Sequence, residues 1–128
     1  MQTIQLIIFD QHSPVVDALK IRLAMEDSLE ILYAGPYQPD FTLNGETAVI
    51  SLLGLTSGRN INPKQTKKVV AHLKGLETAV IVLAPYINET ERELALAAGA
   101  SRYLLKTINT KELIGEITAV YNELNTFI

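Results

Sequence analysis

Five short apolar segments, separated by stretches with helical spacing, constrain the fold of this chain more than any other feature. They cover residues 4–9, 29–33, 48–53, 79–84 and 102–106. Three of them are continuous rather than alternating, which is typical of strands covered on both faces in a parallel sheet. The length of 128 residues suits one domain, 1–128, with a compact core.

Helix start signals lie between these segments. Ser13–Pro14 and Asn62–Pro63 each put a cap residue before a proline at the first helical position. Asn88, with a glutamate three residues later, resembles a capping box, and the last helix is expected to begin near Thr110. The segment 35–46 contains two prolines and two glycines, so it leaves room for only one or two helical turns.

This alternation predicts an α/β protein of the flavodoxin-like type, a three-layer sandwich with helices on both faces of a parallel sheet. A five-stranded sheet of order 2-1-3-4-5 is the commonest arrangement at this length. Ligands of such sheets bind at the carboxyl ends of the strands, beside the first strand. We therefore expect one crevice lined by Asp10, Gln11, Ser51, Ala84 and Lys106.

Composition excludes several other classes of function. A net charge of −3 and a pI of about 5.3 argue against direct nucleic-acid binding by this domain. The chain has no cysteine, hence no disulfide, thiolate metal site or cysteine nucleophile. No signal peptide is evident, and the longest apolar run, 79–87, is far shorter than the roughly 20 residues of a membrane span. We expect a cytoplasmic protein without membrane contact.

The segments 9-FDQHSPVVDAL-19 and 80-VIVLAPYINETERELALAAGASRYLLK-106 resemble the receiver (CheY-like) domain of bacterial two-component response regulators, most closely those of LuxR-type regulators. The most specific run is 98-AGASRYLLK-106. Lys106 follows Ala84 by 22 positions, the separation that the family has between its switch hydroxyl and its lysine. The resemblance implies a carboxylate at the end of the third strand that accepts a phosphoryl group from a histidine kinase. It also implies an acidic pair that holds Mg²⁺, and a hydroxyl and a lysine that bind the new phosphate.

The sequence departs from that pattern at three of the five positions. The acceptor aligns with Ser51, because Glu46 stands five residues before it as an acidic residue does in the family. Gln11 replaces half of the acidic pair, and Ala84 replaces the switch hydroxyl. We therefore expect a pseudo-receiver that is not phosphorylated, has no enzymatic activity and uses no cofactor. The loop 53–62 is longer than usual and should change the rim of the pocket.

Two charged positions of the family pattern remain. Asp10 is the only candidate metal ligand, and a single carboxylate would hold Mg²⁺ weakly. We expect a salt bridge between Asp10 and Lys106 in place of the metal site. His12 is interpreted as a helix-entry residue rather than a catalytic base.

The surface formed by the helix after Asn88, the strand 102–106 and the last helix is the usual partner and dimer surface of receivers. Here it contains Glu89, Glu93, Arg102, Tyr103, Lys111 and Tyr121. We expect it to bind a protein partner or a second copy of the chain. The helix after Pro63 has a basic face, and we interpret that face as solvated. Its lysines are Lys64, Lys67, Lys68 and Lys74.

Two alternatives remain open at this point. The pocket of Asp10, Gln11, Ser51, Ala84 and Lys106 would bind a small anion or metabolite in a ligand-sensing module. A flavodoxin-like enzyme is disfavoured, because 9-FDQHSP-14 contains no glycine for a phosphate loop and no catalytic triad is evident. A DNA-binding output domain after Asn125, or a stand-alone module, would each suit a role in transcriptional control.

Overall fold

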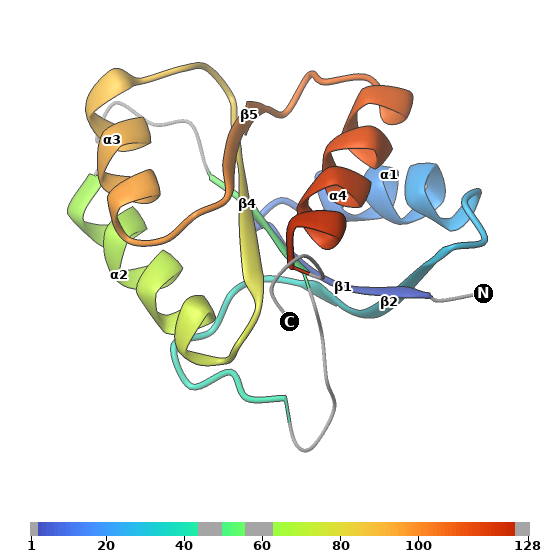
Figure 1. Ribbon diagram of the computed structural model, residues 1–128, viewed down its shortest axis with the longest axis horizontal. Helices are drawn as coiled ribbons and strands as arrows, with labels where there is room; N and C mark the ends of the chain where they lie inside the picture. The colour runs from blue at the N-terminus through green and yellow to red at the C-terminus, as the bar shows by residue number, and fades with distance from the viewer. Residues whose placement is uncertain (1–2, 44–49, 56–62, 125–128) are drawn as a thin grey trace.

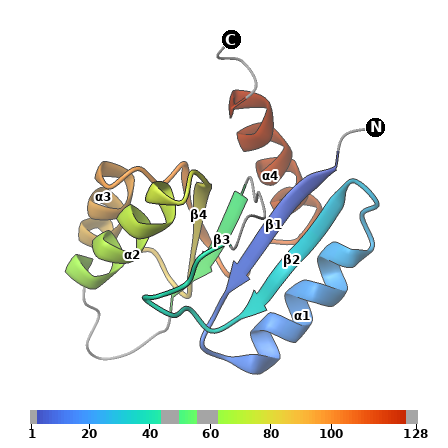
Figure 2. The ribbon, with the colours of Figure 1, turned by 90° about the horizontal axis from the view of Figure 1, so that it is seen from below.

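The computed structural model describes residues 3–43, 50–55 and 63–124, and its strands form one parallel sheet. The order along the sheet is β2-β1-β3-β4-β5, with every neighbouring pair parallel, which confirms the expected α/β fold and strand order. Figure 2 shows β2, β1, β3 and β4 side by side in this sequence. The elements in chain order are β1 Ile4–Phe9, α1 Ser13–Ala24, β2 Leu29–Gly35, β3 Ile50–Gly54, α2 Pro63–Gly75, β4 Ala79–Ala84, α3 Glu89–Ala97, β5 Arg102–Leu105 and α4 Thr110–Leu124.

Helices α2 and α3 cover one face of the sheet, and α1 and α4 cover the other (Figure 1). Successive residues of a strand point to opposite faces, so β1 contributes Leu6 and Ile8 to the core beneath α1 and α4. Ile7 and Phe9 point into the second core, beneath α2 and α3. Because both faces are covered, the central strands are apolar at nearly every position, and this explains the continuous runs in the sequence.

The segment after β2 differs from the expectation of a short helix. Residues 36–43 form no helix, and residues 44–49 lie outside the described part of the chain. An aromatic cluster packs there instead: the ring of Phe9 has its centroid 5.6 Å from that of Tyr33, 5.5 Å from that of Tyr37 and 5.0 Å from that of Phe41. The Tyr37 hydroxyl also lies 2.5 Å from Nδ1 of His72 on α2. The aromatic rings therefore cover apolar surface at this edge of the α2–α3 face.

The helix boundaries follow the start signals in the sequence. Helix α1 has a proline in its first turn, as expected, but Ser13 is its first residue and not its cap: the N-cap is His12, without a side-chain hydrogen bond. The Asn88 side chain accepts a hydrogen bond of 2.8 Å from the backbone N–H of Glu91, which confirms the predicted cap of α3. Helix α4 begins at Thr110, as expected. None of the helices in the described ranges combines the length and the apolar character needed to cross a membrane.

Candidate functional site

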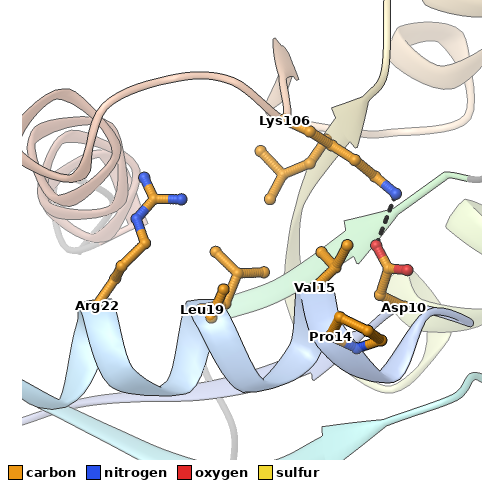
Figure 3. Close-up of a pocket in the computed structure, with 8 residues that line it drawn as sticks. Asp10, Pro14, Val15, Leu19, Arg22 and Lys106 are labelled. Carbon is orange, nitrogen blue, oxygen red and sulfur yellow. Dashed lines mark ion pairs between the residues drawn. The ribbon is translucent and has the colours of Figure 1, made fainter.

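Asp10 follows β1 directly, and its carboxylate is fully buried at the carboxyl edge of the sheet. Oδ1 accepts a hydrogen bond of 2.9 Å from the backbone N–H of His12, the N-cap residue of α1. Oδ2 lies 2.7 Å from Nζ of Lys106, which follows β5 (Figure 3). The predicted Asp10–Lys106 ion pair is thus present in the structure.

The ion pair is close but incompletely hydrogen-bonded. Oδ2 accepts no well-formed hydrogen bond from a donor among the described residues, and the Lys106 ammonium is the cation that lies against it. The 2.7 Å separation still gives a strong coulombic attraction, because that attraction depends on the distance between the charges far more than on angle. The Lys106 side chain is 16% exposed, so the pair is shielded from water on most sides. A pair of this kind balances charge more than it adds stability.

Gly54, the last residue of β3, packs directly against Asp10. Phe9 pairs with Leu53 across the sheet, so the residues that follow them are neighbours. A Cβ atom on Gly54 would lie 2.1 Å from Oδ2 of Asp10 and 2.9 Å from its Cγ. Only a glycine fits at this point unless the Asp10 carboxylate moves.

Ser51 is not in this crevice, contrary to the sequence-based expectation. It pairs with Ile7 and Val80 in the interior of the sheet, three residues before the end of β3. Its side chain is fully buried and lies 2.9 Å from the hydroxyl of Thr78, which in turn donates to the carbonyl of Leu73. The spacing to Glu46 placed the strand end at Ser51, whereas β3 continues to Gly54; Glu46 itself lies outside the described residues.

The remaining two predicted residues contribute little side-chain chemistry. Ala84 ends β4 and is buried in the core beneath α2 and α3. Its carbonyl accepts a hydrogen bond of 2.8 Å from the backbone N–H of Lys106, so it positions the lysine through the main chain. Gln11 is exposed. Of the five predicted residues, only Asp10 and Lys106 bring their side chains together.

The residues at this edge do not fit the Mg²⁺ ion that the family resemblance implies. Mg²⁺ requires near-octahedral oxygen ligands, usually including one or two carboxylates. Asp10 is the one carboxylate here within the described ranges, and its Oδ2 already contacts an ammonium group. Within those same ranges, no three His, Cys, Asp or Glu side chains cluster as metal ligands would.

A cavity of about 270 Å³ lies between α1 and the ends of β4 and β5. No sequence pattern predicted that α1 would form one wall of this cavity. Arg22 donates from Nε to the hydroxyl of Thr110 at 2.7 Å and from Nη2 to the carbonyl of Ile108, also at 2.7 Å. These contacts join residues 86 and 88 positions apart, so no local motif could have predicted them. The lining residues are Asp10, Pro14, Val15, Ala18, Leu19, Arg22, Leu83 and Lys106.

Tyr103, expected on an exposed interaction surface, is instead buried. Its hydroxyl donates a hydrogen bond of 2.6 Å to Glu91 on α3 and accepts one of 3.3 Å from the backbone N–H of Asn88. Burial, reinforced by the hydrogen bond to Glu91, raises the pKa of Tyr103 to about 12. This side chain therefore joins β5 to α3 from inside the fold.

The other residues predicted to form the interaction surface differ in their contacts and in their exposure. Arg102 is held by Glu116 and Glu123 of α4, each 2.7 Å away, and the hydrogen bond to Glu123 is the main reason that the pKa of Arg102 is raised. Lys111 lines a groove toward α1 rather than β5. Tyr121 packs against the core beneath α1 and α4. Glu89 and Glu93 on α3 are exposed, as are the α2 lysines Lys64, Lys67, Lys68 and Lys74.

Comparisons with solved structures identify the fold as that of response-regulator receiver domains. A response regulator from Thermotoga maritima matches with a TM-score of 0.76 and 21% identity, covering 92% of this chain and 97% of the other. A LuxR-family DNA-binding response regulator from Staphylococcus aureus matches at 0.75 with 20% identity over 91% of this chain and 98% of its own.

RcsB of Salmonella typhimurium also matches, with a TM-score of 0.75 and 18% identity over 96% of this chain and 62% of its own. No protein-family model and no curated protein sequence matches the chain. At these identities the comparisons establish the receiver fold.

Proposed function

We propose that this chain is a receiver-like signalling domain that acts through protein contacts without accepting a phosphoryl group. The observation that carries the proposal is the packing of Gly54 against Asp10, where a Cβ would lie 2.1 Å from Oδ2. In the receiver family that the sequence resembles, a nucleophilic carboxylate at the end of the third strand accepts the phosphoryl group. Gly54 ends β3 here, so this strand end has no such side chain and no space for one beside Asp10.

The surroundings of Gly54 support the same reading. Phosphoryl transfer relies on cations that offset the charge of the transferring group. Here the one ammonium group at the site, among the described residues, is already paired with Asp10. Ala84, at the end of β4, has no hydroxyl with which to bind a phosphate. We propose no catalytic role for any of these residues.

Tyr103 supports a fixed rather than switched arrangement of the partner surface. Its hydroxyl is bound within the fold by Glu91 and by the backbone of Asn88. The link between β5 and α3 is therefore made by protein groups alone. A partner surface that keeps one conformation suits a domain in which the availability of the partner is regulated, and not the phosphorylation of the domain.

We propose that self-association uses the surface of α3, β5 and α4. Three exposed apolar side chains lie at the carboxyl end of β4 and β5: Tyr86 is 48% exposed, Ile87 45% and Leu105 39%. The acidic residues Glu89 and Glu93 flank them on α3. By analogy with the LuxR-family regulator from S. aureus, we further propose that the domain contributes to transcriptional control through an attached or partner output domain.

Phosphorylation is tested by incubating the protein with acetyl phosphate and Mg²⁺ and measuring the intact mass. We expect no adduct, and no backbone amide shifts around Asp10 and Lys106 on adding beryllofluoride. The DrrB receiver domain, a structural match whose beryllofluoride-activated form has been solved, is the positive control for the beryllofluoride arm. A stable phosphate adduct on this chain would remove the basis of the proposal.

Self-association is tested by light scattering during size-exclusion chromatography over a range of concentrations. Ile87→Asp should lower the dimer fraction, because it puts a charge into the apolar surface. The matched control is Ile21→Asp on α1, where the side chain is 69% exposed. A strict monomer at every concentration, or equal loss of dimer in both variants, would contradict the proposed surface.

A further inference from the structure

We infer that the cavity beside α1 is a binding site for a small apolar monocarboxylate. This site differs from the pocket expected from the sequence, because Gln11 is exposed and Ser51 lies in the interior of the sheet. Its walls come instead from α1, the end of β4 and the residues flanking β1 and β5 (Figure 3). The inference rests on the cavity alone and does not depend on whether the chain accepts phosphate.

The shape and lining of the cavity favour a small ligand with an apolar body. Its volume of about 270 Å³ lies just below the range of typical ligand pockets and equals roughly nine water molecules of liquid volume. Aliphatic side chains form most of the wall, chiefly those of Val15, Leu19 and Leu83. Water in such a space has few polar partners, so an apolar group that displaces it gains free energy.

The charges around the cavity favour an anion. Asp10, Lys106 and Arg22 all line it, and their formal charges sum to one positive charge. Lys106 is balanced by Asp10 at 2.7 Å. Arg22 takes part in none of the ion pairs formed by the described residues, so its charge is the one without a counterpart.

The Arg22 guanidinium is held in place before any ligand arrives. Its bonds to Thr110 and to the carbonyl of Ile108 fix the side chain over the cavity, between α1 and the start of α4. Nη1 of Arg22 forms no hydrogen bond with the part of the chain that the structure describes. An immobilised arginine loses little rotamer freedom on binding a carboxylate, which its planar group recognises well. The amino end of α4 adds to the positive potential there.

The ligand is therefore oriented by its two ends. Its carboxylate would bind Arg22, and its apolar body would lie along Val15 and Leu19 toward Leu83. An uncharged ligand of the same shape would leave the charge of Arg22 unbalanced and would bind less tightly. A cationic ligand would be repelled.

The test uses 3-phenylpropionate and its uncharged analogue 3-phenylpropionamide as probes, measured by isothermal titration calorimetry and by backbone amide NMR. We expect the carboxylate to bind at least about tenfold more tightly than the amide. Its amide shifts should be centred on Val15, Leu19, Arg22 and Lys106. Binding of both probes with equal affinity, binding of neither up to their solubility, or shifts centred elsewhere would overturn the inference.

Two variants and one control locate the site. Arg22→Met removes the charge and should reduce carboxylate binding to the level of the amide. Arg92→Met on α3 removes an arginine whose nearest acidic partner is Glu89, 3.8 Å away, and should leave binding unchanged. Ala18→Leu enlarges a side chain in the cavity wall while every charge remains, and it should weaken the binding of both probes.

The Ala18→Leu variant keeps the inference testable if Arg22→Met fails to fold, because Ala18 is exposed and forms none of the contacts of Arg22. Thermal unfolding of each variant provides the folding control. Undiminished binding of 3-phenylpropionate by folded Ala18→Leu would overturn the site. A negative result for ligand binding would leave the phosphorylation test unaffected, so the two hypotheses fail separately.

Discussion

Replacing Gly54 with alanine tests the close packing at the end of β3. The new Cβ would lie 2.1 Å from Oδ2 of Asp10, so the carboxylate would have to move. It cannot move without lengthening the hydrogen bond from His12 or the ion pair with Lys106. Overpacking of a core costs about 1–3 kcal/mol, and a lost hydrogen bond to a charged group costs about 1.5–3 kcal/mol.

The expected loss in the free energy of unfolding is therefore about 3–5 kcal/mol. Backbone strain does not contribute, because the φ angle of Gly54 is not in the left-handed region. With compatible backbone angles and no clash, a glycine-to-alanine change would instead stabilise by about 0.4–1 kcal/mol through the unfolded state. A loss of stability in Gly54→Ala would therefore support the steric clash, and a gain would support the effect on the unfolded state.

The assay is urea unfolding followed by far-UV circular dichroism, with the free energy obtained by linear extrapolation. Asp10→Ala provides the second arm of a double-mutant cycle. In that background the new Cβ keeps a 3.2 Å contact with the Cβ of residue 10, which a small shift relieves. Gly54→Ala should then cost less than about 1 kcal/mol, giving a coupling of about 2 kcal/mol or more. The reasoning is refuted if Gly54→Ala is as stable as the wild type, or if it costs as much without the Asp10 carboxylate.

Three further changes have defined outcomes. Ser51→Ala should cost about 1 kcal/mol, measured by urea unfolding, while leaving the NMR resonances of Lys106 in place, because among the described residues the Ser51 hydroxyl bonds only Thr78. Gly115→Ala should stabilise by about 1 kcal/mol, since the added Cβ meets no atom within 4 Å on α4; a loss would mean an unseen contact. For Tyr103, a pKa of about 12 in the folded state exceeds the ordinary value of 10.0, so its contribution is complete below pH 10 and is lost as pH rises toward 12. The wild type should therefore lose about 2 kcal/mol more than Tyr103→Phe over that interval, and parallel pH profiles of the two would contradict the assignment.

The strands of the sheet could be predicted because local hydrophobic patterns in the sequence mark them. Strands covered on both faces must be apolar throughout, and the central runs are. The cap of α3 at Asn88 is equally local, since its side chain bonds the backbone only three residues away. The Asp10–Lys106 ion pair was predictable once the strand order was known, because parallel strands bring their carboxyl ends to one edge.

The register of β3 could not be predicted in the same way. The run from Ile50 to Leu55 is apolar except for Ser51 and Gly54, so no alternation marks which residue ends the strand. Ser51 was assigned to the crevice from its spacing to Glu46, whereas its hydroxyl is satisfied inside the core by Thr78. The exposure of Tyr103 was mispredicted for a related reason. The apolar run 102–106 indicates a strand, but it does not indicate that the Tyr103 side chain turns inward and binds the buried Glu91.

The glycine at the end of β3 and the ion pair beside it depend on each other. A carboxylate at position 54 would add a second negative charge next to Asp10, and the one ammonium of Lys106 could not balance both. In a site with two carboxylates, a metal ion is the usual source of the missing positive charge. With Gly54 in that position, the formal charges of Asp10 and Lys106 already sum to zero, and the backbone of β3 packs directly against Asp10. The glycine and the ion pair therefore form one structural feature, in which the protein itself supplies the charge balance that an ion would provide in a site with two carboxylates.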